Sequence, residues 1–319
     1  MKKKIIMTIC VAAGLAAYAT TIRVDEAVQR SATEALIRAV AKGDVGWAVV
    51  ARAKDGVVVA TADCGNIADE KLPLATTKRF EPGALLSPIT AAIAIDSGIA
   101  SSNTIICTGR DRALYEAFKL PKDDGCLTNE LSLAEAIASS SNAAISRLGL
   151  IVGADKLHNG YSSFGLPILN FRFWSLQQRA RIPQGQGIWV SAIDIAESYA
   201  IIANHGRSTS GRSVISKSAA AQVTGILVNA VENGTGKNAK IDGLRTAGKT
   251  GTVHAISDGR YDLNSYIGSF AGFFPAERPE YVVVVCVASQ GAEGSLAHQG
   301  GGKAAMAFKA IAKEMVLKK

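Results

Sequence analysis

The sequence lacks any group of cysteines and histidines with the spacing of metal ligands. Its four histidines, His158, His205, His254 and His298, are scattered, so we expect structural or surface roles for them and no metal or other cofactor. Lysine and arginine number 35 against 27 acidic residues, yet no basic cluster is interleaved with aromatic residues, which argues against a nucleic-acid partner. Internal repeats and low-complexity linkers are also missing. With 48% hydrophobic residues among 319, the chain can form a packed globular core.

The first residues have the pattern of an export segment. Three lysines precede an apolar run from Ile5 to about Ala19, as in a secretory signal. Cleavage after Ala17-Tyr18-Ala19 and an uncleaved anchor over residues 5–22 are both compatible with this pattern. In either case we expect the body of the protein to be extracytoplasmic: periplasmic, secreted or anchored to the cytoplasmic membrane. We divide the chain into residues 1–22 (signal peptide or anchor), 23–44 (helical lead-in) and 45–319 (main domain).

Four cysteines follow the apolar run. Cys107 and Cys126 flank one short polar stretch, and an oxidising compartment would permit a disulfide between them. Cys286 lies in the apolar run of residues 281–287, where a buried free thiol is the favoured reading.

The alternation of apolar and polar residues predicts an α+β domain. Asp55-Gly56 between two β-rich runs is typical of a hairpin turn, and Ser132 to Glu135 forms a capping box that begins a helix. We expect one antiparallel sheet built from distant parts of the chain, beside a helical lobe. The predicted strands are 47–52, 57–61, 245–254, 266–274 and 281–289, and the predicted helices are 24–41, 84–99, 192–204, 217–232 and 302–316.

Two short motifs combine groups that can bind a substrate. In Lys249-Thr250-Gly251-Thr252 the ammonium group and two hydroxyls suit a carboxylate, and the glycine lets a substrate backbone lie against the strand. Ser140-Ser141-Asn142 stands at a junction of two predicted helices, where Ser140 and Asn142 can point into a cleft. The alternative for this second motif is local helix capping.

The order of these motifs resembles the transpeptidase domain of penicillin-binding proteins, in the superfamily of serine β-lactamases and D,D-peptidases. The resemblance runs from Val45 to the C-terminus and implies a five-stranded antiparallel sheet flanked by helices, an all-helical subdomain and a cleft that acts on the peptide stems of peptidoglycan. The segments that carry it, besides the two motifs above, are 185–191 (GQGIWVS), 203–206 (ANHG), 231–237 (VENGTGK) and 269–275 (SFAGFFP).

The chain departs from the family where catalysis begins. The family's nucleophile and base form a Ser-x-x-Lys tetrad after Glu-Pro-Gly, and here the sequence after Glu81-Pro82-Gly83 places Ala84 and Ser87 at those two positions. Residues three apart share a helix face, which lets the lysine activate the serine. Alanine has no nucleophilic oxygen, and no serine in the chain has a lysine three residues later.

We therefore predict a non-catalytic member of the family. Lys249, Thr250, Gly251, Thr252, Ser140 and Asn142 would hold a peptidoglycan stem peptide or a β-lactam without covalent reaction, or the protein would serve as a scaffold for cell-wall synthesis proteins, with the motifs kept for packing. The membrane is a partner only if the N-terminal segment stays uncleaved. The enzymatic alternative is a weak D,D-transpeptidase or carboxypeptidase that uses Ser87, one helical turn from Ala84 and expected to face the same cleft.

Overall fold

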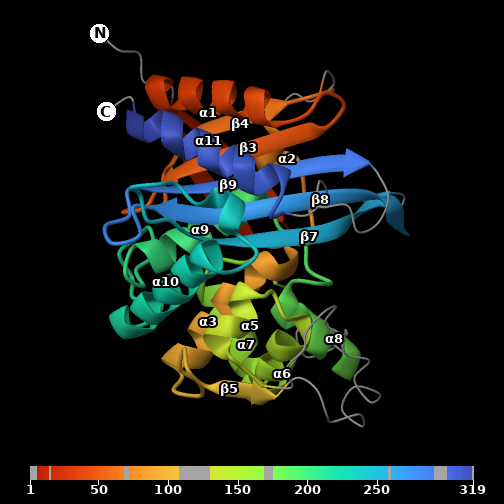
Figure 1. Cartoon of the computed structure of the whole chain (residues 1–319), viewed down its shortest axis with the longest axis vertical. Coiled ribbons are helices and arrows are strands. Elements are labelled where there is room, and N and C mark those ends of the chain that lie inside the picture. The colour runs from red at the N-terminus through yellow and green to blue at the C-terminus, as the bar shows by residue number, and fades with distance from the viewer. Residues whose placement is uncertain are drawn as a thin grey trace.

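The protein is built around one large sheet with helices on both of its faces (Figure 1). The computed structural model describes residues 6–13, 16–67, 72–107, 130–168, 175–257, 260–290 and 300–317, with side chains from residue 22 onward. The strands are β1 (Ile6–Ala13), β2 (Ala16–Arg23), β3 (Val45–Arg52), β4 (Val58–Cys64), β5 (Ile105–Cys107), β6 (Glu130–Ser132), β7 (Ala247–Ser257), β8 (Arg260–Phe274) and β9 (Tyr281–Gln290).

The helices fall into those that cover the sheet and those of the lobe below it. They are α1 (Glu26–Ala39), α2 (Leu74–Thr77), η1 (Gly83–Leu86), α3 (Ser87–Asp96), α5 (Leu133–Ala138), α6 (Asn142–Val152), α7 (Ala154–Ser163), α8 (Leu176–Arg181), η3 (Ile182–Gln184), α9 (Ala192–Ala203), α10 (Lys217–Glu232), η4 (Lys237–Ala239) and α11 (Lys303–Leu317). The expected α+β architecture is therefore confirmed.

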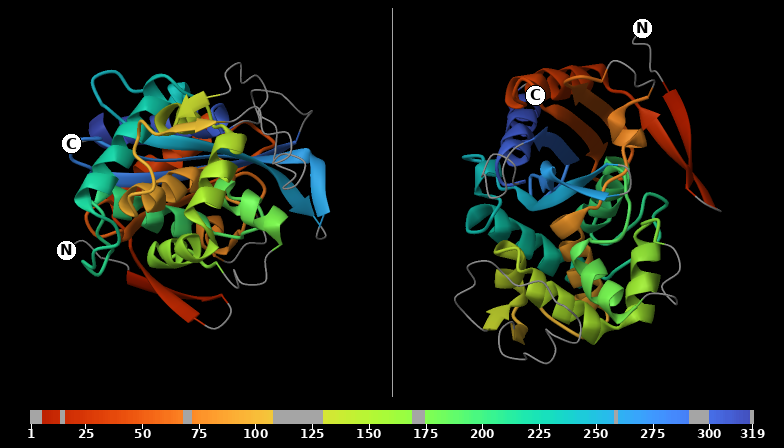
Figure 2. Two further views of the ribbon diagram at one scale, coloured as in Figure 1. Left: turned by 90° about the horizontal axis from the view of Figure 1, so that it is seen from below. Right: turned by 90° about the vertical axis from the view of Figure 1, so that its right-hand side faces the viewer.

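The sheet brings the two ends of the chain together. Its strand order is β1-β2-β4-β3-β9-β8-β7, so that β3 from the first part of the domain pairs with β9 from the last. The five strands from β4 to β7 are antiparallel, as expected. The hairpin of β1 and β2 extends the sheet to seven strands through a single parallel pair, Ile22 with Val58, and Figure 2 shows this hairpin projecting from the body.

Strand β9 explains why one segment is a nearly continuous run of valine. Val282, Val284 and Cys286 pack into the core shared with the helical lobe. The intervening side chains, Val283 and Val285 among them, pack into the core beneath α1 and α11. A strand that is buried on both faces needs apolar residues at every position. Cys286 is fully buried with a free thiol whose pKa burial raises well above its ordinary value, as predicted.

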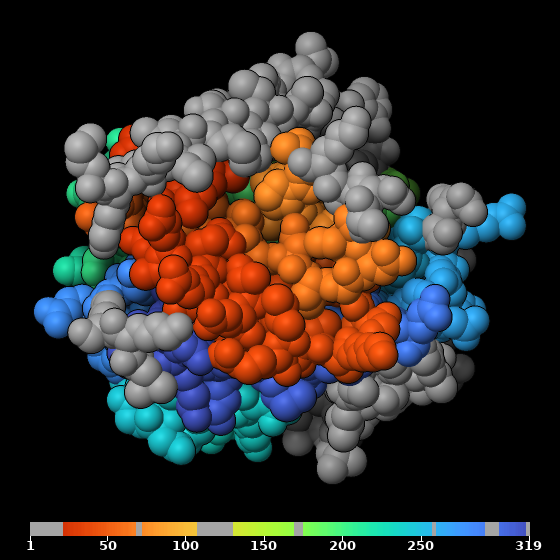
Figure 3. Space-filling model, turned by 90° about the horizontal axis from the view of Figure 1, so that it is seen from above, coloured from red at the N-terminus to blue at the C-terminus, as the bar shows by residue number. Residues whose placement is uncertain are grey.

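Helices α1 and α11 close the upper face. Seen from above, the red N-terminal segment lies beside the dark blue C-terminal one (Figure 3). An ion pair joins the helices, with Arg38 Nη2 at 2.6 Å from Glu314 Oε1. Helix α1 confirms the helix predicted at residues 24–41.

The lower face carries the helical lobe, with α3 at its centre. Nine of the ten residues of α3 are buried, and a helix that is apolar all round must be enclosed by its neighbours. It packs against α6, α7 and α10. The short helix η1 comes directly before α3 and packs against both α3 and β7. It therefore lies between the lobe and the edge of the sheet.

Two expectations stay predictions: the export segment at the N-terminus and the disulfide between Cys107 and Cys126. Residues 6–13 and 16–23 pair as the strands β1 and β2. Within the described ranges no helix has both the length and the apolar character to cross a bilayer. The export segment remains a prediction. Cys126, the expected partner of Cys107, lies outside the described residues.

Candidate active-site cleft

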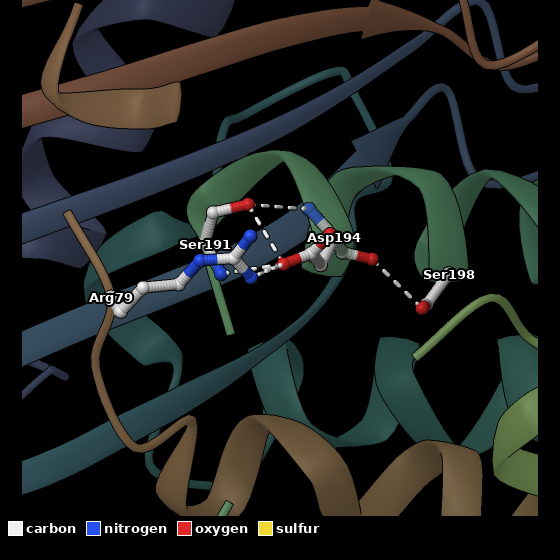
Figure 4. A network of polar contacts seen from close by, with 4 residues as sticks. All are labelled: Arg79, Ser191, Asp194 and Ser198. Carbon is white, nitrogen blue, oxygen red and sulfur yellow. Dashed lines mark hydrogen bonds and ion pairs between the residues drawn. The ribbon is translucent and has the colours of Figure 1, made fainter. Parts of the chain in front are cut away.

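The segment before η1 is fixed to the loop that precedes α9. Phe80 and Val190 exchange backbone hydrogen bonds of 2.9 and 3.0 Å. Arg79 forms an ion pair of 2.6 Å with Asp194, whose carboxylate also accepts from the backbone N–H and hydroxyl of Ser191 in a capping box (Figure 4). These contacts hold the chain in a defined position as it approaches residue 84.

Glu81 continues this attachment. Its buried carboxylate accepts from the Gly187 N–H at 2.7 Å and from the Tyr261 hydroxyl at 3.0 and 3.1 Å. Tyr261 stands near the start of β8, so Glu81 links the β7–β8 hairpin to the loop before α9. Two residues later the Gly83 N–H donates to the Gly185 carbonyl oxygen at 3.2 Å.

Residues 84 and 87 are one helical turn apart and differ in exposure. Ala84, in η1, is half-buried. Ser87 is 2% exposed, and its hydroxyl donates to the Ala84 carbonyl oxygen at 2.8 Å. Ser87 is the first residue of α3, and its hydroxyl turns back to a backbone carbonyl in the preceding turn, so that little of it is open to a substrate. The expectation that Ser87 faces the same cleft as Ala84 stays a prediction.

Strand β7 forms the far edge of the sheet and carries the Lys-Thr-Gly motif. Lys249 is fully buried, and its Nζ donates to Ser140 Oγ at 2.9 Å, to the Thr250 carbonyl oxygen at 2.9 Å and to Thr250 Oγ1 at 3.3 Å. A Cβ at Gly251 would lie only 2.9 Å from the Pro82 carbonyl oxygen. Glycine is thus needed where η1 approaches the strand.

Ser140 occupies the turn between α5 and α6. Its N–H donates to the Ile137 carbonyl oxygen at 3.2 Å, and the N–H of Ser141 donates to the Ala136 carbonyl oxygen at 2.8 Å. This pair of bonds is a Schellman motif, in which the residue at Ser140 adopts a left-handed conformation. Its φ is +61°.

The capping alternative for this motif applies to Ser141 alone. The Ser141 hydroxyl accepts from the Ala144 N–H at 3.1 Å and caps α6. The Ser140 hydroxyl reaches across to Lys249 instead. Asn142, the first residue of α6, is half-buried at the same junction.

Two further residues complete the edge, and sequence reasoning missed both. Thr235 Oγ1 lies 2.7 Å from Thr250 Oγ1, and the Thr235 N–H donates to the Ala138 carbonyl oxygen at 3.0 Å. The Gly300 N–H donates to Thr252 Oγ1 at 2.9 Å. Thr235 lies within a recognised segment, which was a usable signal, whereas nothing in the sequence marks Gly300 as a neighbour of the strand.

Residues 46–313 match the family model of the penicillin binding protein transpeptidase domain. The chain belongs to this family. It is 26% identical over 327 residues to the probable peptidoglycan D,D-transpeptidase PenA of Neisseria meningitidis serogroup A, covering 91% of this chain and 55% of that protein. It is 29% identical over 310 residues to the peptidoglycan D,D-transpeptidase FtsI of Escherichia coli K12, covering 85% of this chain and 52% of that protein. The chain thus spans about half the length of the curated relatives it matches.

Solved structures of the family share this fold. The transpeptidase domain of the FtsI4 D,D-transpeptidase from Legionella pneumophila superposes with a TM-score of 0.72 at 28% identity, covering 92% of this chain and 97% of that one. The transpeptidase domain of penicillin-binding protein 3 from Burkholderia pseudomallei gives a TM-score of 0.79 at 24% identity, covering 92% and 95%. The expected family and fold are confirmed.

In this transpeptidase domain the electrostatics of the cleft centre on Lys249. Burial lowers the pKa of its ammonium group from the ordinary 10.5 to about 7, because a charge without water around it is destabilised. Its hydrogen-bond partners are a carbonyl and two hydroxyl oxygens, and no carboxylate of the described chain pairs with it. An incoming anion would supply the missing counter-charge.

The open side of the edge is formed by Thr252. Thr250 is 5% exposed and its hydroxyl is engaged by Thr235 and Lys249, whereas Thr252 is exposed. Thr252 Oγ1 accepts from the Gly300 N–H, which leaves its O–H available to donate. Over the described part of the chain, no group of histidine, cysteine and acidic residues could hold a metal ion.

Proposed function

We propose that this protein is a cell-envelope transpeptidase-domain protein that binds the carboxyl end of a peptidoglycan stem peptide and does not transfer its acyl group through position 84. One observation carries the proposal: the Lys249 edge retains its hydrogen-bonded partners while the nucleophile position is Ala84. Recognition needs the edge, and acyl transfer at that position needs an oxygen that alanine lacks.

The position of Ser87 supports the second half of the proposal. Its hydroxyl is buried and bonded to the Ala84 carbonyl oxygen, so a substrate carbonyl in the cleft has no access to it. A nucleophile must come within hydrogen-bond range of the reacting group, and misplacement by about 1 Å already costs around a hundredfold in rate.

The proposed ligand has a free carboxylate beside a carbonyl group. The exposed Thr252 hydroxyl would donate to the carboxylate, and the buried Lys249 ammonium group behind it would supply the positive charge, with the peptide lying along the edge of β7 at Gly251. A β-lactam, which carries the same pair of groups, would bind this edge too. We place the protein outside the cytoplasm, exported by its N-terminal segment.

The test compares two synthetic stem peptides that end in a D,D-dipeptide, one with a free carboxylate and one with a carboxamide. Isothermal titration calorimetry at pH 6 should give saturable binding of the first only, and mass spectrometry should find no release of its last residue. Lys249→Met should abolish the preference, whereas Lys217→Met, at an exposed position on α10, should preserve it. Equal affinity for both peptides, or release of the terminal residue, contradicts the proposal.

A gain-of-function variant probes whether the rest of the cleft is intact. The double substitution Ala84→Ser, Ser87→Lys restores the family's tetrad on the same helical face. We expect this variant to form a covalent adduct with a fluorescent penicillin at residue 84, mapped by peptide mass spectrometry. An unmodified residue 84 would indicate that the cleft has lost more than the tetrad.

A further inference from the structure

We propose that Asn238 is a positioning residue that orients the Thr252 hydroxyl at the edge of β7. It acts through three consecutive glycines, residues 300–302, which stand directly before α11 and are called the glycine turn below. The inference rests on the proposed function and adds to it a residue of η4 that lies outside the motifs of the cleft.

The glycine turn lies against the backbone of the strand edge. The Gly300 N–H donates to Thr252 Oγ1 at 2.9 Å. A Cβ at Gly300 would lie only 2.2 Å from the carbonyl oxygens of Gly251 and Ser269, which pair with each other across β7 and β8. A side chain would not fit in so close an approach of two backbones. The turn therefore reaches Thr252 with backbone atoms alone.

Glycines cannot hold such a turn in place by themselves. Glycine has the greatest backbone freedom of all residues, and the turn has no side chains of its own that could pack or form hydrogen bonds. Its position must therefore be set by the groups around it. Asn238 supplies one of these groups, because its Nδ2 donates to the Gly301 carbonyl oxygen at 2.6 Å. This contact lies one residue from the N–H that bonds Thr252.

The residues on either side of the glycine turn are themselves fixed. Next to Asn238, Ala239 is fully buried in the core beneath α1 and α11, and its N–H donates to the Gly236 carbonyl oxygen at 2.9 Å. At the other end of the turn, Lys303 Nζ lies 2.6 Å from Asp44 Oδ2. Asn238 thus joins the turn to a rigid part of the domain.

The orientation of the Thr252 hydroxyl is the property that a ligand would detect. Thr252 is exposed, and the Gly300 N–H takes a lone pair of its oxygen, which leaves the O–H to donate. A donor is what a carboxylate needs. A group that is oriented before the ligand arrives loses less entropy on binding. We therefore expect Asn238 to raise the affinity for a carboxylate without touching it.

The first measurement follows the glycine turn without any ligand. Selective ¹⁵N-glycine labelling allows amide hydrogen exchange to be followed at Gly300 by NMR. In Asn238→Ala the protection of the Gly300 N–H should fall roughly tenfold, because the turn opens more often. Asn159→Ala, at an exposed position on α7, should leave that protection unchanged. Unchanged protection in Asn238→Ala overturns the proposal.

The second measurement is calorimetric titration of the free-carboxylate stem peptide at pH 6. Asn238→Ala should weaken binding roughly fivefold, the usual effect of one hydrogen bond, with little change in the urea midpoint because the side chain is exposed. In a Thr252→Val background the same substitution should have no further effect on affinity. An equal loss in both backgrounds would mean that Asn238 does not act through Thr252, and would overturn the proposal.

Together the two measurements separate the role of Asn238 from the proposed function. Loss of Gly300 protection in Asn238→Ala, with no carboxylate-dependent binding by the parent protein, would reject the proposed function and support the positioning of the glycine turn. Carboxylate-dependent binding that Asn238→Ala leaves unchanged would uphold the proposed function and reject the role of Asn238.

Discussion

The hydroxyl of Ser87 donates to the carbonyl oxygen of Ala84, 2.8 Å away. The two positions at which the family has its nucleophile and base are thus joined by a local hydrogen bond at the start of α3. The relationship is structural, because Ser87 is 2% exposed. In the proposed function the ligand binds instead at the edge of β7, which packs against η1.

If Ser87 has only this local role, Ser87→Ala should cost about 1 kcal/mol of unfolding free energy, the usual contribution of one hydrogen bond. Urea unfolding measures this loss. Stem-peptide affinity should stay within twofold of the parent value. A tenfold loss of affinity with unchanged stability would place Ser87 in the binding site.

The close approach of Gly185 to Gly83 should make residue 185 intolerant of any side chain. A Cβ there would lie 2.1 Å from the Gly83 carbonyl oxygen, at φ of +83°. Because that oxygen belongs to the backbone and cannot rotate away, we expect Gly185→Ala to destabilise the protein by roughly 3 kcal/mol or more.

Gly187→Ala is the matched control for this prediction. Gly187 has nearly the same φ, +80°, but a Cβ there meets nothing within 4 Å. Only the conformational strain remains, about 1–2 kcal/mol. Thermal or urea unfolding of both variants should give clearly different losses, and equal losses would mean that the contact with Gly83 is unimportant.

Lys249 should make stability depend on pH in the alkaline range. Its pKa is about 7 in the folded protein and 10.5 ordinarily, so the unfolded chain holds the extra proton between these values. Stability therefore rises with pH over that window, by at most about 1.4 kcal/mol per pH unit. The penalty is fully present below pH 7 and disappears near pH 10.5.

Lys249→Met removes this dependence and provides the measurement. Its unfolding free energy relative to the parent should be most favourable below pH 7, where relief of the buried charge is worth up to roughly 5 kcal/mol, and the difference should shrink steadily as pH rises toward 10. A difference that does not change between pH 6 and 10 would show that Lys249 has an ordinary pKa in the folded protein.

Peptide binding should show the opposite dependence on pH. A carboxylate pairs with the ammonium form of Lys249, so above pH 7 the protein must take up a proton in order to bind. Affinity for the free-carboxylate peptide should fall by up to tenfold per pH unit from pH 7 upward. Calorimetry in buffers of different ionisation enthalpy should detect the uptake at pH 8, and binding without it would exclude Lys249 as the partner.

Local patterns determined most of the architecture. The valine run of β9 and the apolar helix α3 were predicted because a continuous apolar run indicates a segment that is buried on all sides. The β1–β2 hairpin was not predicted, because an apolar run at the N-terminus has the same composition in an export segment as in a pair of strands.

The sequence predicted most residues of the candidate site, but only part of how they are arranged in space. Lys249 and Ser140 were both named, yet their contact joins residues 109 positions apart, and no local pattern encodes such a distance. The spacing placed Ser87 one helical turn from Ala84, but no pattern in the sequence shows that its hydroxyl is buried and bonded to the Ala84 carbonyl oxygen. Gly300 was missed because a backbone N–H has no signature in a sequence.

By itself the sequence determined which side chains stand at each position. Residue 84 has no side-chain oxygen, residue 87 is not a lysine, and a lysine, Lys249, stands between Gly248 and Thr250. Those are covalent facts that no fold can alter. Only the tertiary structure decided what surrounds them. Burial of Lys249 removes the water that would keep its charge, and the α5–α6 turn brings the Ser140 hydroxyl to it. The protonation of one amine, and with it the chemistry open to the cleft, is therefore set by packing.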